Sequence, residues 1–225
     1  MRTKTAKAIL TNVKKIYNDI SEEFSKTRQN IWDEFKVFND YIKHGDSIAD
    51  IGCGNGRFFK FISKTKRVTY TGIDNSKKLI NIAAKTFKTP KFIEGDILKI
   101  PLKTNSKNVT VSIAVLHHIP SKALREKAVK ELARITKKKG KLLLTVWNLK
   151  EQKKYKTQVR KAFLRWMATL GKYEKRGLQI PWGKEKTPRY YYAFTQKELE
   201  KLLDPFFEII HKRKGKNLIY ICEKK

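Results

Sequence analysis

Short apolar runs rich in β-branched residues alternate along the chain with longer segments whose apolar residues recur at helical spacing. This alternation is typical of βα units that build a mainly parallel sheet with helices on both faces. We predict seven strands, over residues 47–51, 68–73, 91–94, 108–113, 141–146, 207–211 and 217–222. The pattern therefore predicts an α/β fold.

The last two runs are separated only by residues 212–216, which are too few for a helical crossover. We therefore predict that they pair as an antiparallel hairpin, so that the last strand runs antiparallel within a mostly parallel sheet. Between other strands, Ser76, Ser121 and Thr195 are expected helix N-caps, and Thr195 with Glu198 has the T-x-x-E spacing of a capping box.

Two segments lie outside this alternation. Residues 1–45 are expected to form a helical extension before the first strand. Residues 148–194 form an insertion far longer than a usual βα loop, with a basic helical stretch at 153–170 and an aromatic run at 190–192. Because the insertion leaves from the carboxyl end of a strand, where open α/β sheets bind ligands, we expect it to bind the substrate. The alternative is that the insertion is a disordered basic loop.

We expect the whole chain, residues 1–225, to form one domain.

The first predicted strand ends in a glycine-rich turn with the spacing G-x-G-x-G, formed by Gly52, Gly54 and Gly56. Glycine permits positive φ and close approach of a ligand to the backbone, and the helix that follows presents free N–H groups. The next strand ends at Asp74, about 20 residues on, where an acid can hold ribose hydroxyls. The turn therefore predicts a nucleotide-like cofactor.

The charge suggests a second partner. The chain has 225 residues, and 52 basic against 21 acidic residues give it a net charge of +31. Basic clusters interleaved with aromatic residues favour RNA over a membrane surface, although lysine can also accumulate simply as a solvated surface residue. No apolar run reaches the roughly 18 residues of a membrane span, and the N-terminus lacks the apolar block of a signal peptide. We expect a cytoplasmic protein without a membrane partner.

Cysteine and histidine spacing gives no metal site. Cys53 and Cys222 are far apart in sequence, which indicates neither a disulfide framework nor a C-x-x-C motif. The fourth predicted strand runs into His117 and His118, a pair that could bind a metal or act as a base. No other clustered ligands accompany it, so we predict no metal, and one of the two histidines is expected to be structural.

The glycine turn and the acid after the second strand resemble class I S-adenosylmethionine methyltransferases. This resemblance implies a Rossmann-like seven-stranded sheet. It also implies that Asp74 binds the ribose, Asp50 orients the donor's amino group and Asp96 meets the adenine. The implied cofactor site comprises Tyr17, Asp50, Gly52, Gly54, Gly56, Asp74, Asn75, Asp96, Ile97 and Ile113.

Several further motifs, taken in order, are similar to the tRNA wobble-uridine carboxymethyl methyltransferase family. They are residues 16–21 leading to Phe24–Arg28, Ser112–His118, Trp147 before Glu151-Gln152, Pro181-Trp182, and Arg189-Tyr190-Tyr191 leading to Phe194 and Glu198-Leu199. The family methylates the carboxylate of 5-carboxymethyluridine at the wobble position. Its eukaryotic and archaeal members work with a small zinc-binding activator protein.

The resemblance implies that the substrate contacts Arg125, Trp147, Trp182, Arg189, Tyr190 and Asn217. The chain departs from the family pattern in two places. It keeps only one arginine, Arg125, of the pair that usually follows the histidines, and Leu218 follows Asn217 where the family usually has tryptophan. Both departures concern substrate or partner contacts, whereas the cofactor residues are unaffected.

The implied chemistry needs alignment more than proton transfer. A carboxylate is already ionised at neutral pH, so no general base is required, and proximity can supply roughly 7–11 kcal/mol of the barrier. A cation is expected to touch the carboxylate, and Arg28, His117 and His118 are the candidates. Tyr17 and Arg28 could instead close the N-terminal helix over the donor.

Two other functions are alternatives to a tRNA methyltransferase. One is a small-molecule carboxyl or carbon methyltransferase, and the other is a non-catalytic RNA-binding protein with a relic cofactor pocket.

Overall fold

The computed structural model describes residues 1–28, 30–183 and 185–225. Seven strands form one sheet in the order β3-β2-β1-β4-β5-β9-β8. They are β1 (Ser47–Ile51), β2 (Thr69–Asp74), β3 (Lys91–Glu94), β4 (Lys107–Ile113), β5 (Thr136–Trp147), β8 (Phe207–Lys214) and β9 (Asn217–Lys224). β1 pairs parallel with β2 and β4, whereas β9 pairs antiparallel with β5 and β8. The predicted fold class and the antiparallel last strand are confirmed.

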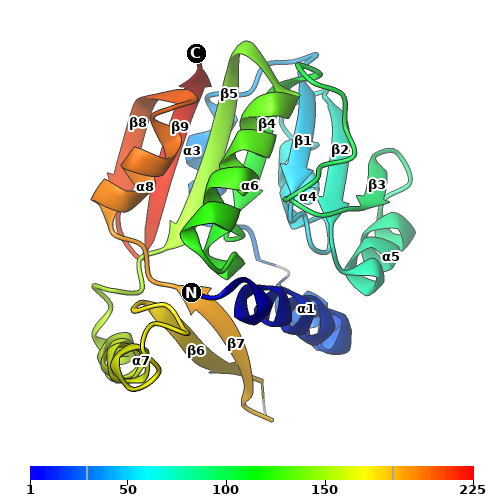
Figure 1. Cartoon of the computed structure of the whole chain (residues 1–225). Helices are drawn as coiled ribbons and strands as arrows, with labels where there is room; N and C mark the ends of the chain where they lie inside the picture. The colour runs from blue at the N-terminus through cyan, green and yellow to red at the C-terminus, as the bar shows by residue number, and fades with distance from the viewer. Residues whose placement is uncertain (29, 184) are drawn as a thin grey trace.

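Helices cover both faces of the sheet (Figure 1). On one face lie α6 (Lys122–Ile135) and α8 (Gln196–Leu203), and on the other lie α3 (Asp33–Asn39) and α4 (Arg57–Ile62). Side chains alternate between faces along a strand. In β9, Leu218 and Tyr220 join the cluster under α6 and α8, whereas Ile219 and Ile221 join the cluster under α3 and α4.

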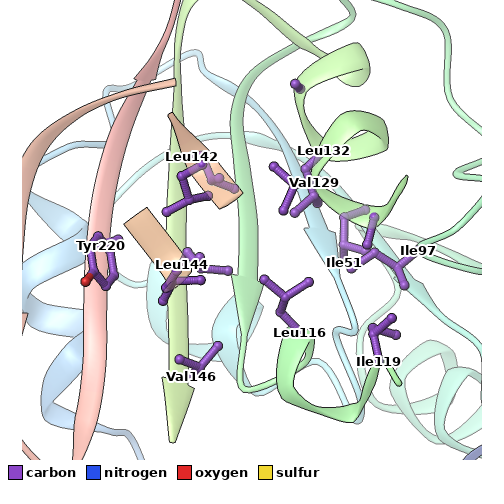
Figure 2. Close-up of a cluster of buried hydrophobic side chains, with 14 of the residues drawn as sticks. Ile51, Ile97, Leu116, Ile119, Val129, Leu132, Leu142, Leu144, Val146 and Tyr220 are labelled. Carbon is purple, nitrogen blue, oxygen red and sulfur yellow. The ribbon is translucent and has the colours of Figure 1, made fainter. Parts of the chain in front are cut away.

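The larger core cluster lies between β5 and α6 (Figure 2). Leu142, Leu144 and Val146 of β5 point to the same side as Tyr220, toward the helix that carries Leu132, and all five side chains are buried. Burying one such side chain contributes about 1.5–3 kcal/mol. This packing holds the carboxyl ends of β4 and β5 in a fixed position.

The predicted N-caps are confirmed. The Ser76 hydroxyl accepts a hydrogen bond from the backbone N–H of Leu79 at the start of α5 (Lys77–Thr86), and Ser121 caps α6 in the same way. Thr195 and Glu198 form the complete capping box of α8. These side chains fix where each helix begins.

Two strands begin earlier than predicted, β4 by one residue, at Lys107, and β5 by five. β5 begins at Thr136 rather than at Lys141. The Thr136 hydroxyl contacts the Thr110 hydroxyl at 2.7 Å and donates to the Leu132 carbonyl at 2.7 Å, and Lys137–Lys139 follow as exposed residues. The basic run hides the alternation that sequence reasoning uses, since none of its side chains is apolar.

The N-terminal extension is helical, as predicted. α1 (Thr3–Asp19) and α2 (Ser21–Thr27) precede α3. Figure 1 shows α1 lying at the end of the sheet where the parallel strands finish, beside β7 on one side and α5 on the other. The extension therefore covers the edge at which a ligand is expected.

The insertion contains a short 3-10 turn (Lys153–Tyr155), helix α7 (Lys156–Ala168) and an antiparallel hairpin of β6 (Gly177–Trp182) and β7 (Thr187–Tyr192). The helix was predicted and the hairpin was not. Pro181 pairs with Pro188 across the hairpin, and prolines argue against strands because they lack an N–H. They are tolerated here because the described sheet has only two strands. The described part of the insertion packs as ordered structure around Leu149, Leu178 and Tyr191.

Candidate functional site

A pocket of about 1150 Å³, its open mouth included, lies at the carboxyl ends of β1, β2 and β4. Its wall combines these strand ends with residues of α1, α2 and β7. Of the predicted site residues, the wall contains Tyr17, Arg28, Asp50, Gly52, Gly54, Asp74, Asn75, Ile97, Ile113, His117, His118, Trp147 and Arg189. It does not contain Gly56, Asp96, Arg125, Trp182, Tyr190 or Asn217.

The glycine turn forms one side of the pocket. Gly52 has a φ of +79°, and a Cβ there would lie 2.2 Å from a methyl group of Val115. Gly54 has a φ of +56°, and its N–H donates to Asp74 Oδ2 at 2.9 Å. A side chain is thus excluded at Gly52 by both backbone conformation and space, and is disfavoured at Gly54 by its positive φ, so the backbone at these two positions can approach a ligand closely.

Two carboxylates, buried Asp50 and half-buried Asp74, border this turn. Asp74 also accepts from the N–H of Ser76 at 2.9 Å, and burial raises its pKa. Asp50 accepts the Tyr70 hydroxyl, and burial raises the pKa of Asp50 to about 7 even though that hydrogen bond opposes the shift. A ligand that brings a positive charge and hydroxyl donors would compensate both groups.

Two of the predicted cofactor residues lie beside the wall. Asp96 accepts from the N–H of Leu98 at 2.8 Å and so holds its own turn, while its neighbours Gly95 and Ile97 line the pocket. Gly56 precedes α4 with a φ of +78°, and a Cβ there would lie 3.0 Å from the Phe87 ring. Gly56 therefore serves packing behind the turn.

Two arginines stand at the N-terminal side of the pocket. Arg28 lies 5.3 Å from the Phe24 ring centroid, and Arg57 lies 4.0 Å from that of Trp32. Burial and then the nearby charge of Arg28 lower the pKa of Arg57 to about 10. Arg57 was not predicted, although its place as the first residue after the glycine turn marks it as a neighbour of any ligand there.

His118 is held in one tautomer. Its Nδ1 lies 2.8 Å from the Tyr190 carbonyl oxygen, which can only accept, so Nδ1 carries the hydrogen. Its Nε2 therefore accepts from the Tyr17 hydroxyl at 2.9 Å. Burial lowers the pKa of His118 to about 3, with a further contribution from the charge of Arg189. The ring is neutral, so the expectation that it supplies a cation is not met.

His117 is neutral as well, but its orientation differs. Its Nδ1 accepts from the backbone N–H of Trp147 at 3.1 Å, so Nε2 carries the hydrogen. Burial lowers its pKa well below the usual value; the adjacent His118, which would repel it if both rings were protonated, and the charge of Arg189 act in the same direction. Within the described residues, Nε2 has no hydrogen-bond partner. His117 therefore offers a neutral donor at the pocket rather than a cation.

Arg189 is the buried cation of the pocket. Its residue is 3% exposed, and its Nη1 donates to the Tyr17 hydroxyl oxygen at 3.1 Å. Across the described ranges, no ion pair includes Arg189 and its Nε has no partner. A buried charge without a counter-charge is costly. An anionic ligand would provide the missing partner.

Aromatic rings flank this cation. Trp147 and Tyr191 stack with centroids 4.9 Å apart, and His117 lies 5.0 Å from Tyr191. Trp182, outside the wall, contacts the ring of Phe24 at 6.3 Å and lies under Arg189 at 5.3 Å. Tyr191 was not singled out, because a run of three tyrosines does not show which of them faces the pocket until the strand's direction is known.

Three predicted substrate residues have other partners. Arg125 forms a buried ion pair with Glu174, and the Tyr190 hydroxyl also donates to Glu174. Asn217 donates to Glu34 Oε1 at 2.8 Å. Their predicted direct contact with the substrate is not supported by these positions, because burial and tertiary contacts turn their side chains away from the pocket wall.

Two further features are absent from the described residues. No group of three or more His, Cys, Asp or Glu side chains there could hold a metal ion. No helix there is long and apolar enough to cross a membrane.

Comparison with known proteins places the chain among methyltransferases. A methyltransferase domain family matches residues 49–144. The Encephalitozoon cuniculi protein named "Putative methyltransferase" is 30% identical over 218 residues, which cover 94% of this chain and 95% of that protein.

Two longer relatives carry a more specific name. The tRNA (carboxymethyluridine(34)-5-O)-methyltransferase of Xenopus tropicalis is 35% identical over 142 residues, and that of Arabidopsis thaliana is 33% identical over 140 residues. These matches cover 63% and 62% of this chain. They cover only 22% and 33% of the relatives, so the matched part spans a minor share of those proteins.

Solved structures share the fold. An S-adenosylmethionine-dependent methyltransferase of Methanosarcina mazei superposes with a TM-score of 0.71 at 24% identity, over 87% of this chain and 98% of that chain. A chain from the complex between a Haloferax volcanii methyltransferase activator and a "putative methyltransferase" gives 0.67 at 13% identity, over 94% and 97%.

Proposed function

The chain belongs to the class I S-adenosylmethionine-dependent methyltransferases, and we propose that it acts as a tRNA carboxymethyluridine methyltransferase, which methylates the carboxylate of 5-carboxymethyluridine at the wobble position of tRNA. The product would be the methyl ester. The proposal rests on the two sides of the pocket, one suited to a cationic donor and the other to an anionic acceptor.

The donor side fits S-adenosylmethionine, the cofactor of this enzyme class. The Gly52 turn leaves no room for a side chain, Asp74 can take the ribose hydroxyls, and Asp50 lies buried beside it without a salt-bridge partner among the described residues. Arg28 and Arg57 line the same pocket, and we infer that they bind the donor's carboxylate. When bound, the cofactor supplies an electrophilic methyl group on a positively charged sulfur.

The acceptor side is the observation that carries the proposal. Arg189 is a buried guanidinium in the pocket wall, and in the described part of the chain no carboxylate neutralises it. His117 Nε2–H is a second buried donor that lacks a partner there. A carboxylate on the acceptor would satisfy both, because charged donors and carboxylates form the stronger hydrogen bonds.

The neutral histidines agree with a reaction that transfers no proton. The acceptor carboxylate is ionised at neutral pH. Arg189 is already partly used by Tyr17, so it can orient the carboxylate while leaving one oxygen free for the methyl group. The residues of the chain thus act by alignment and by excluding water.

The insertion supports a tRNA acceptor. Between residues 152 and 176 it has nine basic side chains, Lys153, Lys154, Lys156, Arg160, Lys161, Arg165, Lys172, Lys175 and Arg176. Its one acidic residue there, Glu174, is paired with Arg125. Such a surface would bind phosphates near the anticodon loop.

We extend the proposal to a cytoplasmic enzyme that works with a small zinc-binding activator protein. The partner is supported by the fold that the chain shares with a chain from the complex between a methyltransferase activator and a "putative methyltransferase".

The proposal is tested by incubating the protein with S-adenosylmethionine and tRNA that contains 5-carboxymethyluridine, with and without a candidate activator. Mass spectrometry of the released nucleosides is expected to show the methyl ester, and Asp74→Ala should abolish it. No ester under either condition would overturn the proposal.

Two measurements separate the alternatives. Binding to tRNA should weaken steeply with salt if several phosphates are contacted, whereas a small-molecule enzyme would show no tRNA binding even at low salt. Calorimetry with S-adenosylmethionine excludes a relic pocket if the donor binds.

A further inference from the structure

A network of buried polar residues outside the pocket wall has no part in the reaction described above. Glu174 accepts from Arg125 Nη2 at 2.8 Å and Nη1 at 3.0 Å, and their side chains are 11% and 5% exposed. The same carboxylate accepts the backbone N–H of Ser121 at 3.1 Å and the hydroxyl of Tyr190. Burial opposes its ionisation, but the hydrogen bonds and charge of Arg125 hold the pKa of Glu174 below its usual value.

This carboxylate joins two parts of the molecule. Arg125 belongs to α6 of the core, whereas Glu174 lies in the insertion just before β6 and Tyr190 lies in β7. The packing around it is tight, since a Cβ on Gly177 would lie 2.9 Å from the Tyr190 ring. The Arg125 guanidinium also lies 3.6 Å from the Tyr192 ring centroid. Glu174 therefore fixes the position of β7 against the core.

From Tyr190 a second series of hydrogen bonds leads to the pocket. The Tyr190 carbonyl accepts His118 Nδ1–H at 2.8 Å, and His118 Nε2 accepts the Tyr17 hydroxyl at 2.9 Å. The Tyr17 oxygen then accepts Arg189 Nη1–H at 3.1 Å. Because the carbonyl can only accept, the direction of every bond in the series is determined.

We propose that Glu174 is a positioning residue for Arg189: it holds Tyr190, whose carbonyl orients His118 and, through Tyr17, the guanidinium that meets the acceptor carboxylate. This inference rests on the proposed function. Stability alone does not require the ion pair, since apolar residues of similar volume can often replace a buried pair without loss. Apolar residues could not, however, accept the Tyr190 hydroxyl.

The chain offers a matched pair of variants. Tyr190→Phe removes the hydroxyl bonded to Glu174 and keeps the ion pair. Tyr192→Phe removes an equivalent hydroxyl, which donates to Glu198 at 2.9 Å, on the same face of β7 but without a connection to His118. We expect Tyr190→Phe to raise KM for the tRNA about tenfold, the factor for one lost hydrogen bond, with kcat changed less. Tyr192→Phe should leave KM unchanged, and neither variant should alter the affinity for S-adenosylmethionine measured by calorimetry.

A spectroscopic readout is independent of the acceptor's identity. Nitrogen-15 NMR of the histidine side chains should show His118 as a single Nδ1–H tautomer in the wild type and in Tyr192→Phe, and as a tautomer mixture in Tyr190→Phe and Glu174→Gln. If the methyl-ester assay fails but the spectra show the expected tautomers in the wild type and the variants, the proposed function is overturned and the positioning role is not. An unchanged His118 tautomer together with unchanged KM in folded Tyr190→Phe would overturn the positioning role.

Should Glu174→Gln fail to fold, the double variant Arg125→Met/Glu174→Leu removes both buried charges. We expect the thermal midpoint of the double variant to return toward the wild-type value, whereas its KM for tRNA should stay above the wild-type KM. A stable double variant with normal KM would show that the ion pair is only structural and would overturn the inference.

Discussion

The two sides of the pocket are built in opposite ways. On the donor side, Gly54 and Asp74 are 20 residues apart, the first in the turn after β1 and the second at the end of the neighbouring strand β2. On the acceptor side, Tyr17 and Arg189 are 172 residues apart, and Tyr17 and His118 are 101 apart. The core of the donor side thus depends on one local unit, to which the N-terminal extension adds Arg28, whereas the acceptor side exists only when the N-terminal extension, the end of β4 and the insertion come together.

Their charges are opposite too. The donor side presents the carboxylates of buried Asp50 and half-buried Asp74 to the methyl donor's cationic groups and hydroxyls, and the acceptor side presents the buried guanidinium of Arg189. The same donor site can therefore serve a different acceptor when only the N-terminal extension and the insertion change. Substitutions should therefore separate the two sides cleanly.

Asp74→Ala should have the largest effect. It removes a carboxylate in the pocket wall that also holds the N–H groups of Gly54 and Ser76. With hydrogen bonds to a charged group contributing about 1.5–3 kcal/mol each, we expect donor affinity to fall at least 100-fold in calorimetry. Asp96→Ala is the control, since Asp96 lies beside the wall, and should cost much less. Equal losses in both variants would contradict this assignment.

Arg189→Met should break the acceptor side alone. Truncating one partner of a buried charge pair costs about 2–5 kcal/mol, so kcat/KM for tRNA should fall by about 30-fold or more. Arg189→Lys keeps the charge without the planar fork and should recover part of the activity. Donor affinity, measured by calorimetry, should stay within about twofold because the sites are separate. A parallel loss of donor binding would mean that the two sides are not independent.

The pH dependence of donor binding sharpens the contrast further. With a pKa of about 7, Asp50 is protonated as pH falls below neutrality, so affinity for the cationic donor should drop about fivefold from pH 7 to pH 6. The raised pKa also means that this group makes the free protein less stable as pH rises from about 4 to 7. Asp50→Asn should remove both dependences, as calorimetry and thermal melting across this range will show.

Asn217→Ala should have the smallest effect. Asn217 pairs with Trp147 between strands, but its side chain donates to Glu34 rather than lining the pocket. We expect KM for tRNA to stay within about twofold and the thermal midpoint to fall by about 2–4 °C, the shift for 1 kcal/mol in a domain of this size. A large rise in KM with an unchanged midpoint would restore the predicted substrate contact.

Sequence reasoning was strongest where structure is local. The strands, the capping box at Thr195 and the glycine turn were recognised because each depends on residues close in sequence. The hairpin β6–β7 was missed because Pro181 and Pro188 argue against strands, and only the absence of further neighbours in the described sheet makes them acceptable.

The acceptor side shows the limit of sequence patterns. The residues Arg189-Tyr190-Tyr191 were noticed, but a strand sends alternate side chains to opposite faces, so Tyr190 turns to Glu174 while Arg189 and Tyr191 reach the pocket. The histidine pair was likewise noticed, but only burial shows that both rings are neutral. Arg189 then replaces His117, His118 and Arg28 as the cation we propose for the acceptor.

By itself, the sequence determined the α/β order of elements, the glycine turn with Asp74 and the excess of positive charge, because backbone conformation and composition are local properties. The tertiary structure decided which cation lies buried without a counter-charge and which tyrosine supports it. Those features depend on desolvation and on contacts between segments more than 70 residues apart, such as His118 and Tyr190, which no local pattern encodes.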